Sequence, residues 1–454
     1  MKNPCGGGNR PGAVAERTRG STITDSNAYT AFLSRKQARI EKPGREVIAA
    51  DVHPMLHPWQ NELVRWAVRT SRAALWADTG MGKTIMQLEW ARLSAPASLI
   101  VAPLAVCQQT VREAARIGIE ARYVRHYTDI DGPGVWVTNY ERVHNFPAHL
   151  FEAVVLDESS ILKQSDGKTR TMLIEHFREV PHRLACSATP APNDPEELTS
   201  QAEWLGRMTR SHMLAAYFIH DQDGWRLKGH ARRPMMRWMA QWAVALTRPS
   251  DVGGDDTGYE LPGLDVVPEI ITAEIDVDGQ LFATEIGGVT GRAELRRKTL
   301  RARVDRAAKL VANEPGAWIM WCGLNAEADA LAAAIPNSVN VHGTLDPDEK
   351  ARLLLGFADG EFGVLITKPS IASQGLNYQH CARMAFVGLS DSYEQYYQAI
   401  RRCYRYGQQK VVRAHVIVSD LESQIAANVS RKEQQASQIT SELVNEMKRV
   451  REAV

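Results

Sequence analysis

Eight consecutive residues, Ala77–Thr84, have the types and spacing of a loop that holds phosphate. They read Ala-Asp-Thr-Gly-Met-Gly-Lys-Thr, the Walker A arrangement with alanine in place of its first glycine. Glycines here can adopt positive φ, which turns backbone N–H groups toward a phosphate, whereas the competing interpretation is a plain glycine turn with a surface lysine. Lys83 would reach the β- and γ-phosphates of ATP, and the Thr84 hydroxyl would bind Mg²⁺. The predicted ATP-binding residues of this loop are Thr79, Gly80, Met81, Gly82, Lys83 and Thr84.

A pair of adjacent carboxylates could supply the other half of a phosphate-transfer site. The apolar run Ala153–Leu156 leads into Asp157 and Glu158, the Walker B pattern of a strand that ends in two acids. Asp157 would bind Mg²⁺, and Glu158 would orient or deprotonate the attacking water. Two neighbouring carboxylates repel each other, so both are most easily ionised beside a bound cation. Alone, the pair could equally be an acidic turn after a strand; downstream of a phosphate loop, it predicts an ATP-hydrolysing site.

Strands and helices must alternate along the chain to hold these loops in place. Short apolar runs alternate with amphipathic stretches in two sets, which predicts two α/β units with parallel sheets. The first set has expected strands at 72–77, 98–102, 135–138, 153–156 and 183–186, and a helix at 83–93. The second set has expected strands at 317–321, 364–367, 384–387 and 412–418, and helices at 325–334, 347–358 and 393–404. Residues 205–310 read as an irregular linker or insertion, and 421–451 as a polar helix.

Several further short segments occur in a fixed order. They are His57–Gln60, Leu99–Pro103, Thr138–Glu141, Ser187–Thr189, Trp318–Leu324, His342-Gly343, Lys368–Asn377 and Gln398–Gln408. Together with the phosphate loop and the acidic pair, they resemble the motifs of superfamily II helicases and translocases, over roughly residues 50–420. The branch that they resemble is the Swi/Snf-like one. Asp157-Glu158-Ser159-Ser160 with the nearby Lys163 is similar to the compact Swi/Snf-like proteins of bacteriophages.

The resemblance implies a fold, a domain organisation and a set of roles. The fold would be two tandem RecA-like P-loop domains with parallel sheets and an inter-domain helical insertion, and ATP would lie between the domains. The expected domains are a flexible tail 1–45, a first domain 46–210, a basic and partly helical insertion 211–310, a second domain 311–430 and a C-terminal helix 431–454. Gln60 would read adenine, Gly375 would contribute to the ATP site, and Ser187, Ala188 and Thr189 would couple nucleotide state to nucleic-acid binding.

The last motif would bring arginines to the phosphates. Gln398, Arg402 and Arg405 stand at i, i+4 and i+7, so the expected helix places them on one face. By resemblance they complete the catalytic set with Lys83 and the two acids, whereas by spacing alone a solvated basic helix face would explain them. Arg401 stands where the family commonly has glycine.

The charge balance excludes a protein that coats nucleic acid by bulk charge. The 454 residues carry a formal net charge of only +1, so nucleic-acid contact would depend on local basic clusters. The candidate contacts are Arg292, Arg296, Arg297, Lys298, Arg301, Lys228 and Arg232, and the alternative for each cluster is a solvated helix face. Met235, Trp238, Met239 and Trp242 recur at helical spacing, which favours a buried amphipathic helix over a base-stacking platform.

Cysteine usage and the apolar runs indicate the compartment. The six cysteines include no Cys-x-x-Cys pair, so neither a zinc site nor a disulfide framework is favoured. The N-terminus has no signal-peptide pattern, and no apolar run approaches the roughly 20 residues of a membrane span. We expect a cytoplasmic protein, or one in the host cytoplasm if it comes from a phage, with no membrane partner and no particular protein partner indicated.

The expected activity is ATP hydrolysis, with ATP and Mg²⁺ as cofactors, coupled to movement along double-stranded or branched DNA. Two alternatives remain at this stage. The chain could be a helicase that separates the strands of DNA or RNA, or a nucleotide-gated DNA-binding switch with little turnover. Glu158 and the two arginines favour turnover over a switch.

Overall fold

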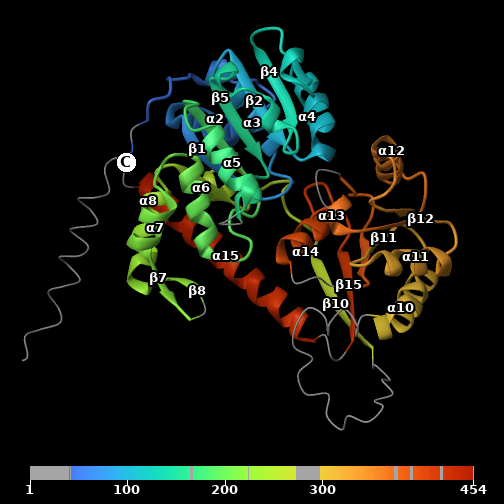
Figure 1. Ribbon diagram of the computed structural model, residues 1–454. Coiled ribbons are helices and arrows are strands. Elements are labelled where there is room, and N and C mark those ends of the chain that lie inside the picture. Colours follow the sequence, from blue (N-terminus) through green and yellow to red (C-terminus); the bar gives the residue numbers. More distant parts are fainter. Residues whose placement is uncertain are drawn as a thin grey trace, which may run out of the picture. The chain divides into compact units, whose positions relative to one another are not determined.

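Two sheets of parallel strands organise the chain (Figure 1). The structure, a computed structural model, describes residues 40, 42–163, 167–222, 224–271, 297–372, 377–388, 392–419 and 423–452. No helix in these ranges is both long enough and apolar enough to cross a membrane.

The first sheet has seven strands in the order β3-β4-β2-β5-β6-β1-β9, and each neighbouring pair is parallel. The strands are β1 (Arg72–Ala77), β2 (Ala97–Ala102), β3 (Ala121–Tyr123), β4 (Gly134–Asn139), β5 (Ala153–Asp157), β6 (His182–Cys186) and β9 (Ala243–Leu246). The helices of this half are α2 (Pro58–Thr70), α3 (Lys83–Ser94), α4 (Leu104–Arg116), α5 (Lys168–His176), α6 (Leu198–Trp204), α7 (Arg210–Tyr217) and α8 (Arg232–Met239). A small antiparallel hairpin, β7 (Phe218–Asp221) with β8 (Gly224–Leu227), lies between α7 and α8 in the sequence.

The second sheet has six strands in the order β10-β15-β14-β11-β13-β12, again with parallel neighbours. The strands are β10 (Leu264–Ile271), β11 (Trp318–Trp321), β12 (Ser338–Val341), β13 (Val364–Thr367), β14 (Arg383–Phe386) and β15 (Val412–Ser419). The helices are α10 (Leu300–Asn313), α11 (Asn325–Ala334), α12 (Pro347–Ala358), α13 (Pro369–Ala372), α14 (Tyr393–Ile400) and α15 (Ser423–Glu452). Hydrophobic clusters cover both faces of this sheet.

The central strands are largely apolar because helices cover a parallel sheet on both faces. All five residues of β5 are buried, and so are all four of β11. The α/β prediction with two parallel sheets is therefore confirmed, and each strand expected from an apolar run is present with its bounds shifted by at most one residue. The two phosphate-site motifs lie at the C-terminal ends of β1 and β5.

Part of the predicted insertion belongs to the sheets. Residues 243–246 form β9 and pair with β1, and residues 264–271 form β10 and pair with β15. The expectation of an irregular 205–310 was therefore wrong for these strands. Both are edge strands. Strand β10 is only partly buried and contains Pro268, so it lacks the continuous apolar run of a central strand, whereas β9 is a short, fully buried apolar run that the sequence analysis missed. The Met/Trp helix is α8, and its buried residues confirm the core interpretation over base stacking.

The helix expected at 393–404 ends at Ile400. The carbonyl oxygen of Arg402 accepts a hydrogen bond from Tyr378 N–H (2.9 Å), and the next N–H groups make short-range turn bonds. Arg402 and Arg405 therefore lie on turns after the helix, and the prediction that they share a helix face with Gln398 was wrong.

The N-terminal segment is described only in part. Residues 1–39 and 41, most of the predicted tail, lie outside the described residues. Residues 42–48 lie against the first half of the chain, where Gly44 N–H donates to Arg69 O (3.1 Å) and Arg45 Nε donates to Leu93 O (2.7 Å). Val47 is buried there, so residues 42–48 pack with the first half of the chain.

The C-terminal helix α15 follows the last strand of the second sheet and packs on α8 and on β9 of the first (Figure 1). Leu443, Val444 and Met447 are buried, and the Met447 sulfur accepts a hydrogen bond from Ala245 N–H (3.3 Å) on the edge strand. An ion pair joins Arg232 of α8 to Glu442 of this helix. The chain therefore links the two sheets twice, once through residues 247–263 and once through α15.

A buried ion pair stabilises the second half. The guanidinium of Arg303 (α10) lies 2.6 Å from Glu327 Oε1 (α11), and both side chains are fully buried. The other oxygen of Glu327 accepts the N–H groups of Gly323 and Leu324 at the start of α11. This pair fixes two helices to the end of β14, since Arg303 also donates to Val387 O.

We expect Arg303→Met to lower the free energy of unfolding by about 3–5 kcal/mol, because it leaves the Glu327 carboxylate buried without its cation. Urea unfolding would measure this loss. The matched control is Arg352→Met, which removes an arginine from an exposed pair with Glu349 and should change stability by at most about 0.5 kcal/mol. Equal effects of the two substitutions would contradict the role given to the buried pair.

Candidate functional site

The phosphate loop joins β1 to α3 with a backbone suited to an anion. Gly80 and Gly82 have φ of 89° and 74°, which is the left-handed region that glycine adopts without strain. Lys83 begins α3, and its ammonium donates to Ala77 O (2.7 Å) and Asp78 O (3.2 Å). A helix N-terminus directly after such a loop offers N–H groups and a positive dipole end to phosphate.

Gln60 ties this loop to α2. Its Nε2 donates to Met81 O (3.1 Å) in the loop, and its Oε1 accepts from His57 N–H (2.9 Å) at the start of the helix. The side chain is buried. The residue expected to read adenine is therefore in contact with the phosphate loop itself.

The acidic pair lies at the end of β5, and Glu158 has a strained backbone. Its φ of 61° is rare for a residue with a side chain, and such strain concentrates at functional sites. Its Oε1 accepts from Ser187 Oγ (2.6 Å) and from Ser160 Oγ (3.1 Å). These hydroxyls hold the carboxylate in one orientation.

The charges in this region perturb one another. Burial, followed by the neighbouring Glu158, raises the pKa of Asp157 to about 6, although Lys83 opposes the rise. Burial lowers the pKa of Lys83, while the two acids oppose that change. A carboxyl that is buried beside a second acid is stabilised as an anion by a nearby cation.

The residues present fit a magnesium ion. The predicted ligands, the hydroxyl of Thr84 and the carboxylate of Asp157, are hard oxygen donors of the kind Mg²⁺ prefers. No group of three or more His, Cys, Asp or Glu side chains that could hold a metal occurs among the described residues. A phosphate-loop site does not need one, because phosphate oxygens and water complete the coordination.

The second half of the chain contributes side chains to the same place. Gln398 Nε2 lies 3.5 Å from Glu158 Oε2, and Arg402 Nη2 donates to Gln398 Oε1 (2.9 Å). Burial, then Arg405, lowers the pKa of Arg402 to about 10, and Glu158 opposes that change. Arg405 also has a lowered pKa because of burial, and its Nε is buried without a hydrogen-bond partner. These arginines remain charged at neutral pH beside the acids of the first half.

The segment predicted to couple nucleotide state to nucleic-acid binding, 187–189, lies next to the acidic pair. Ser187 contacts Glu158 directly, and the N–H of Thr189 donates to Ser187 Oγ (3.0 Å). Thr189 Oγ1 is buried without a partner, and Ala188 is partly exposed. Gly375, the remaining predicted ATP-site residue, lies outside the described residues.

Sequence reasoning missed several side chains that surround this site. Asp78 accepts bonds from Tyr397 and Arg401, and Glu394 contacts Ser160 and Lys163. The available signal was the spacing along α14, since Glu394 lies one turn before Gln398 on the same helix face. A stacked pair, Tyr259 with Tyr406 (ring centroids 4.6 Å), also lies beside the phosphate loop.

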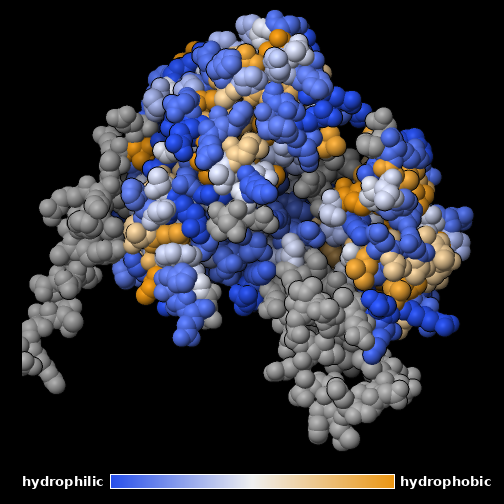
Figure 2. All heavy atoms as spheres, in the orientation of Figure 1, coloured by the Kyte–Doolittle hydropathy of each residue, from blue (hydrophilic) through white to orange (hydrophobic). Residues whose placement is uncertain are grey.

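The basic clusters divide into two groups. Arg232 pairs with Glu442 of α15, and Lys228 donates to Ala215 O (3.1 Å), so this cluster is engaged within the protein. Arg297, Lys298 and Arg301 are exposed and line a hollow of about 410 Å³ between α10 and α11. Figure 2 shows hydrophilic side chains beside a hydrophobic patch in this region. Arg292 and Arg296 lie outside the described residues.

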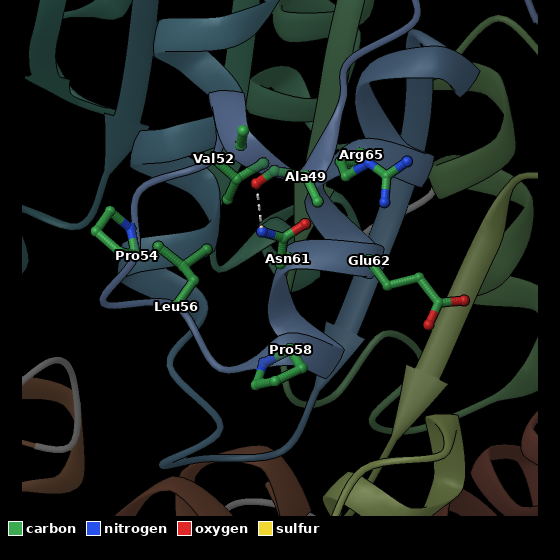
Figure 3. A pocket seen from close by; sticks show the side chains of 9 residues that line it. Ala49, Val52, Pro54, Leu56, Pro58, Asn61, Glu62 and Arg65 are labelled. Carbon is green, nitrogen blue, oxygen red and sulfur yellow. Dashed lines mark hydrogen bonds between the residues drawn. The ribbon is translucent and has the colours of Figure 1, made fainter.

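A second hollow, of about 610 Å³, lies on the first half of the chain (Figure 3). It is lined by the segment from Ala49 to Leu56 and by the face of α2 that carries Asn61 and Arg65. Asn61 Nδ2 donates to Ala49 O (3.0 Å) across it. None of the residues predicted to bind ATP lines this hollow.

Residues 303–407 match the family model of the helicase conserved C-terminal domain. No sequence among the curated proteins matches the chain. Among solved structures, the chain is similar to the Sulfolobus solfataricus SWI2/SNF2 ATPase core in complex with dsDNA, with 15% sequence identity and a TM-score of 0.44 over 88% of this chain and 96% of that chain. A likeness at that TM-score says nothing about activity, whereas the family match covers the segment that brings Gln398, Arg402 and Arg405 to the site.

We expect Gly82→Ala to weaken binding of a fluorescent ATP analogue about tenfold or more, which corresponds to ~1.4 kcal/mol. A Cβ at this position would lie 2.4 Å from Gln60 Nε2, so the substitution displaces Gln60 from the loop. The control is Gly118→Ala, which has a similar positive φ but meets nothing within 4 Å. Both substitutions carry backbone strain, so equal losses of affinity would contradict a specific role for the Gln60 contact.

Proposed function

We propose that the chain is an ATP-dependent DNA translocase of the superfamily II type, in which ATP hydrolysis between two RecA-like domains drives movement along double-stranded DNA. The observation that carries the proposal is the meeting of Glu158 with Gln398, because it brings the acidic pair and the last motif into one site. The family match over residues 303–407 supports the helicase-type second domain.

The residues of the first half would bind ATP and prepare the attacking water. The loop from Thr79 to Thr84 would surround the phosphates with N–H groups, and Lys83 would move from its carbonyl partners to the phosphate oxygens. A magnesium ion held by Thr84 and Asp157 would neutralise developing phosphate charge. Glu158, fixed by Ser187, would orient the water and accept its proton.

The second half would supply the positive charge that the transition state needs. Arg402 and Arg405 would stabilise that charge from across the cleft, an effect worth about 10³–10⁵ in rate in related phosphoryl-transfer enzymes. Gln398 would hold Arg402 toward Glu158, since it contacts both. Repeated binding and hydrolysis would then open and close the two halves and change their grip on DNA.

DNA contact would use exposed basic side chains at the start of α10. Arg297 and Lys298 come just before this helix and Arg301 lies in its first turn; all three are exposed and line one hollow, and they suit sequence-independent phosphate contacts. Ser187 bonds Glu158 and accepts a hydrogen bond from the N–H of Thr189, and this direct link to the acidic pair suits a role in coupling.

We expect duplex DNA to stimulate ATP hydrolysis by the wild-type chain and Lys83→Ala to lower kcat/KM by at least about 100-fold, because phosphate binding loses its cation. Glu158→Gln should retain ATP affinity but lower kcat about 10²–10⁴-fold, because it removes the general base. Steady-state ATPase assays and equilibrium binding would measure both. ATP turnover that survives Lys83→Ala would disprove the proposal, and Arg352→Ala serves as the surface-arginine control.

Triplex displacement and strand displacement would separate translocation from unwinding. A translocase is expected to strip a third strand from duplex DNA with ATP and to leave the duplex intact. Separation of the duplex would instead favour a strand-separating helicase. Retention on DNA that depends on ATP but occurs without stimulated hydrolysis would favour a nucleotide-gated switch.

A further inference from the structure

The helix α14 contacts the first half of the chain through one face. Glu394, Tyr397, Gln398 and Arg401 stand at i, i+3, i+4 and i+7, so they project from the same side of the helix and its final turn. Each has a partner near the phosphate loop or the acidic pair. The contacts therefore extend beyond the residues proposed to act on ATP.

Asp78, one residue before Thr79, receives two of these contacts. Its Oδ1 accepts from the backbone N–H of Thr79 and from the hydroxyl of Tyr397, and its Oδ2 accepts from the guanidinium of Arg401. The side chains of Arg401 and Asp78 are only 13% and 11% exposed. A carboxylate this deeply buried needs a compensating charge, and Arg401 supplies it.

The guanidinium of Arg401 contacts two aromatic rings as well as the carboxylate of Asp78. It lies over the rings of Tyr397 and Tyr404, each with its centroid 5.3 Å away. Burial lowers the pKa of Arg401 to about 10, so the group stays charged at neutral pH. A planar guanidinium can stack on rings and bond a carboxylate at once, whereas an ammonium group lacks that geometry.

Arg401 differs from its neighbours in what it contacts. Arg402 donates to the carbonyl oxygen and side chain of Gln398 within its own half. Arg405 Nε is buried without a partner. Arg401 forms an ion pair with Asp78 of the phosphate loop.

The N-terminal end of α14 also contacts the first half of the chain. Glu394 pairs with Lys163 and lies 2.7 Å from Ser160 Oγ. An acid near the start of a helix and a base after its end both agree with the helix dipole. The helix is therefore fixed at both ends to the first half.

We infer that Arg401 is a positioning residue that latches α14 to the phosphate loop and neutralises Asp78 where the phosphates of ATP enter. The inference rests on the proposed ATP hydrolysis and adds a residue to it. Without Arg401, an unpaired carboxylate beside the loop would repel ATP, and α14 would lose the contact that keeps Arg402 directed at the cleft.

The inference can be tested by a double-mutant cycle on the full chain. Arg401→Ala is expected to raise KM for ATP about tenfold or more and to change kcat less, because the unpaired carboxylate opposes binding. Adding Asp78→Asn to this variant should recover most of the loss, since the amide carries no charge. Arg401→Lys should be intermediate, and the surface control Arg352→Ala should match the wild type.

The same cycle distinguishes a latch from a catalytic arginine. Asp78→Asn is expected to recover nothing in an Arg402→Ala background. An equal loss in Arg401→Ala with and without Asp78→Asn would overturn the inference while leaving the proposed function intact.

Nucleotide-free thermal unfolding keeps the test independent of turnover. If the wild-type chain hydrolyses no ATP, the proposed function fails. The melting temperatures of the variants then test the contact between Arg401 and Asp78 on their own. The losses from Arg401→Ala and Asp78→Asn should then be smaller in combination than their sum. Additive losses would show that the two residues do not interact.

Discussion

Opposite charges from the two halves of the chain meet in one buried place, where the ion pair of Asp78 with Arg401 joins them. The first half contributes Asp78, Asp157 and Glu158, and the last two lie near Lys83. The second half contributes Arg401, Arg402 and Arg405, and burial lowers the pKa of each. Burying charge is costly unless a partner of opposite sign accompanies it. The two sheets, their connecting strands and α14 can therefore be understood as the scaffold that brings these groups together.

Much of the fold was predictable because central parallel strands are buried on both faces. A continuous apolar run such as Ala153–Leu156 predicts a buried strand from its composition alone. The edge strands β3 and β10 do not, since β3 has only three residues and β10 has no fully buried residue; the apolar run of β9 was missed because it lies within a segment that otherwise reads as a linker. Their pairing is decided by partners distant in the sequence, which no local pattern contains.

The loops of the candidate site were predictable for a similar reason. A phosphate loop requires glycines and a lysine within a few residues, so its signal is local. The pair of Asp78 with Arg401 joins residues separated by 323 positions, and nothing near either residue identifies the other. The end of the helix at Ile400 could not be predicted either, because the N–H of Tyr378, which is distant in the sequence, bonds the carbonyl oxygen of Arg402 in the following turn. Local chemistry was readable from the sequence, and the contacts between the halves required the structure.

The return of α15 to the first sheet has a consequence for the order in which the protein is made. Strand β9 lies at the edge of the first sheet, and an exposed edge is open to pairing with other chains. Met447 contacts this edge strand from 202 positions further along the chain. Domains generally fold as they emerge during synthesis, so β9 is made and can pair with β1 before α15 is present to cover it. In that interval the edge of the first sheet is open to pairing with another chain, and the docking of α15 closes it.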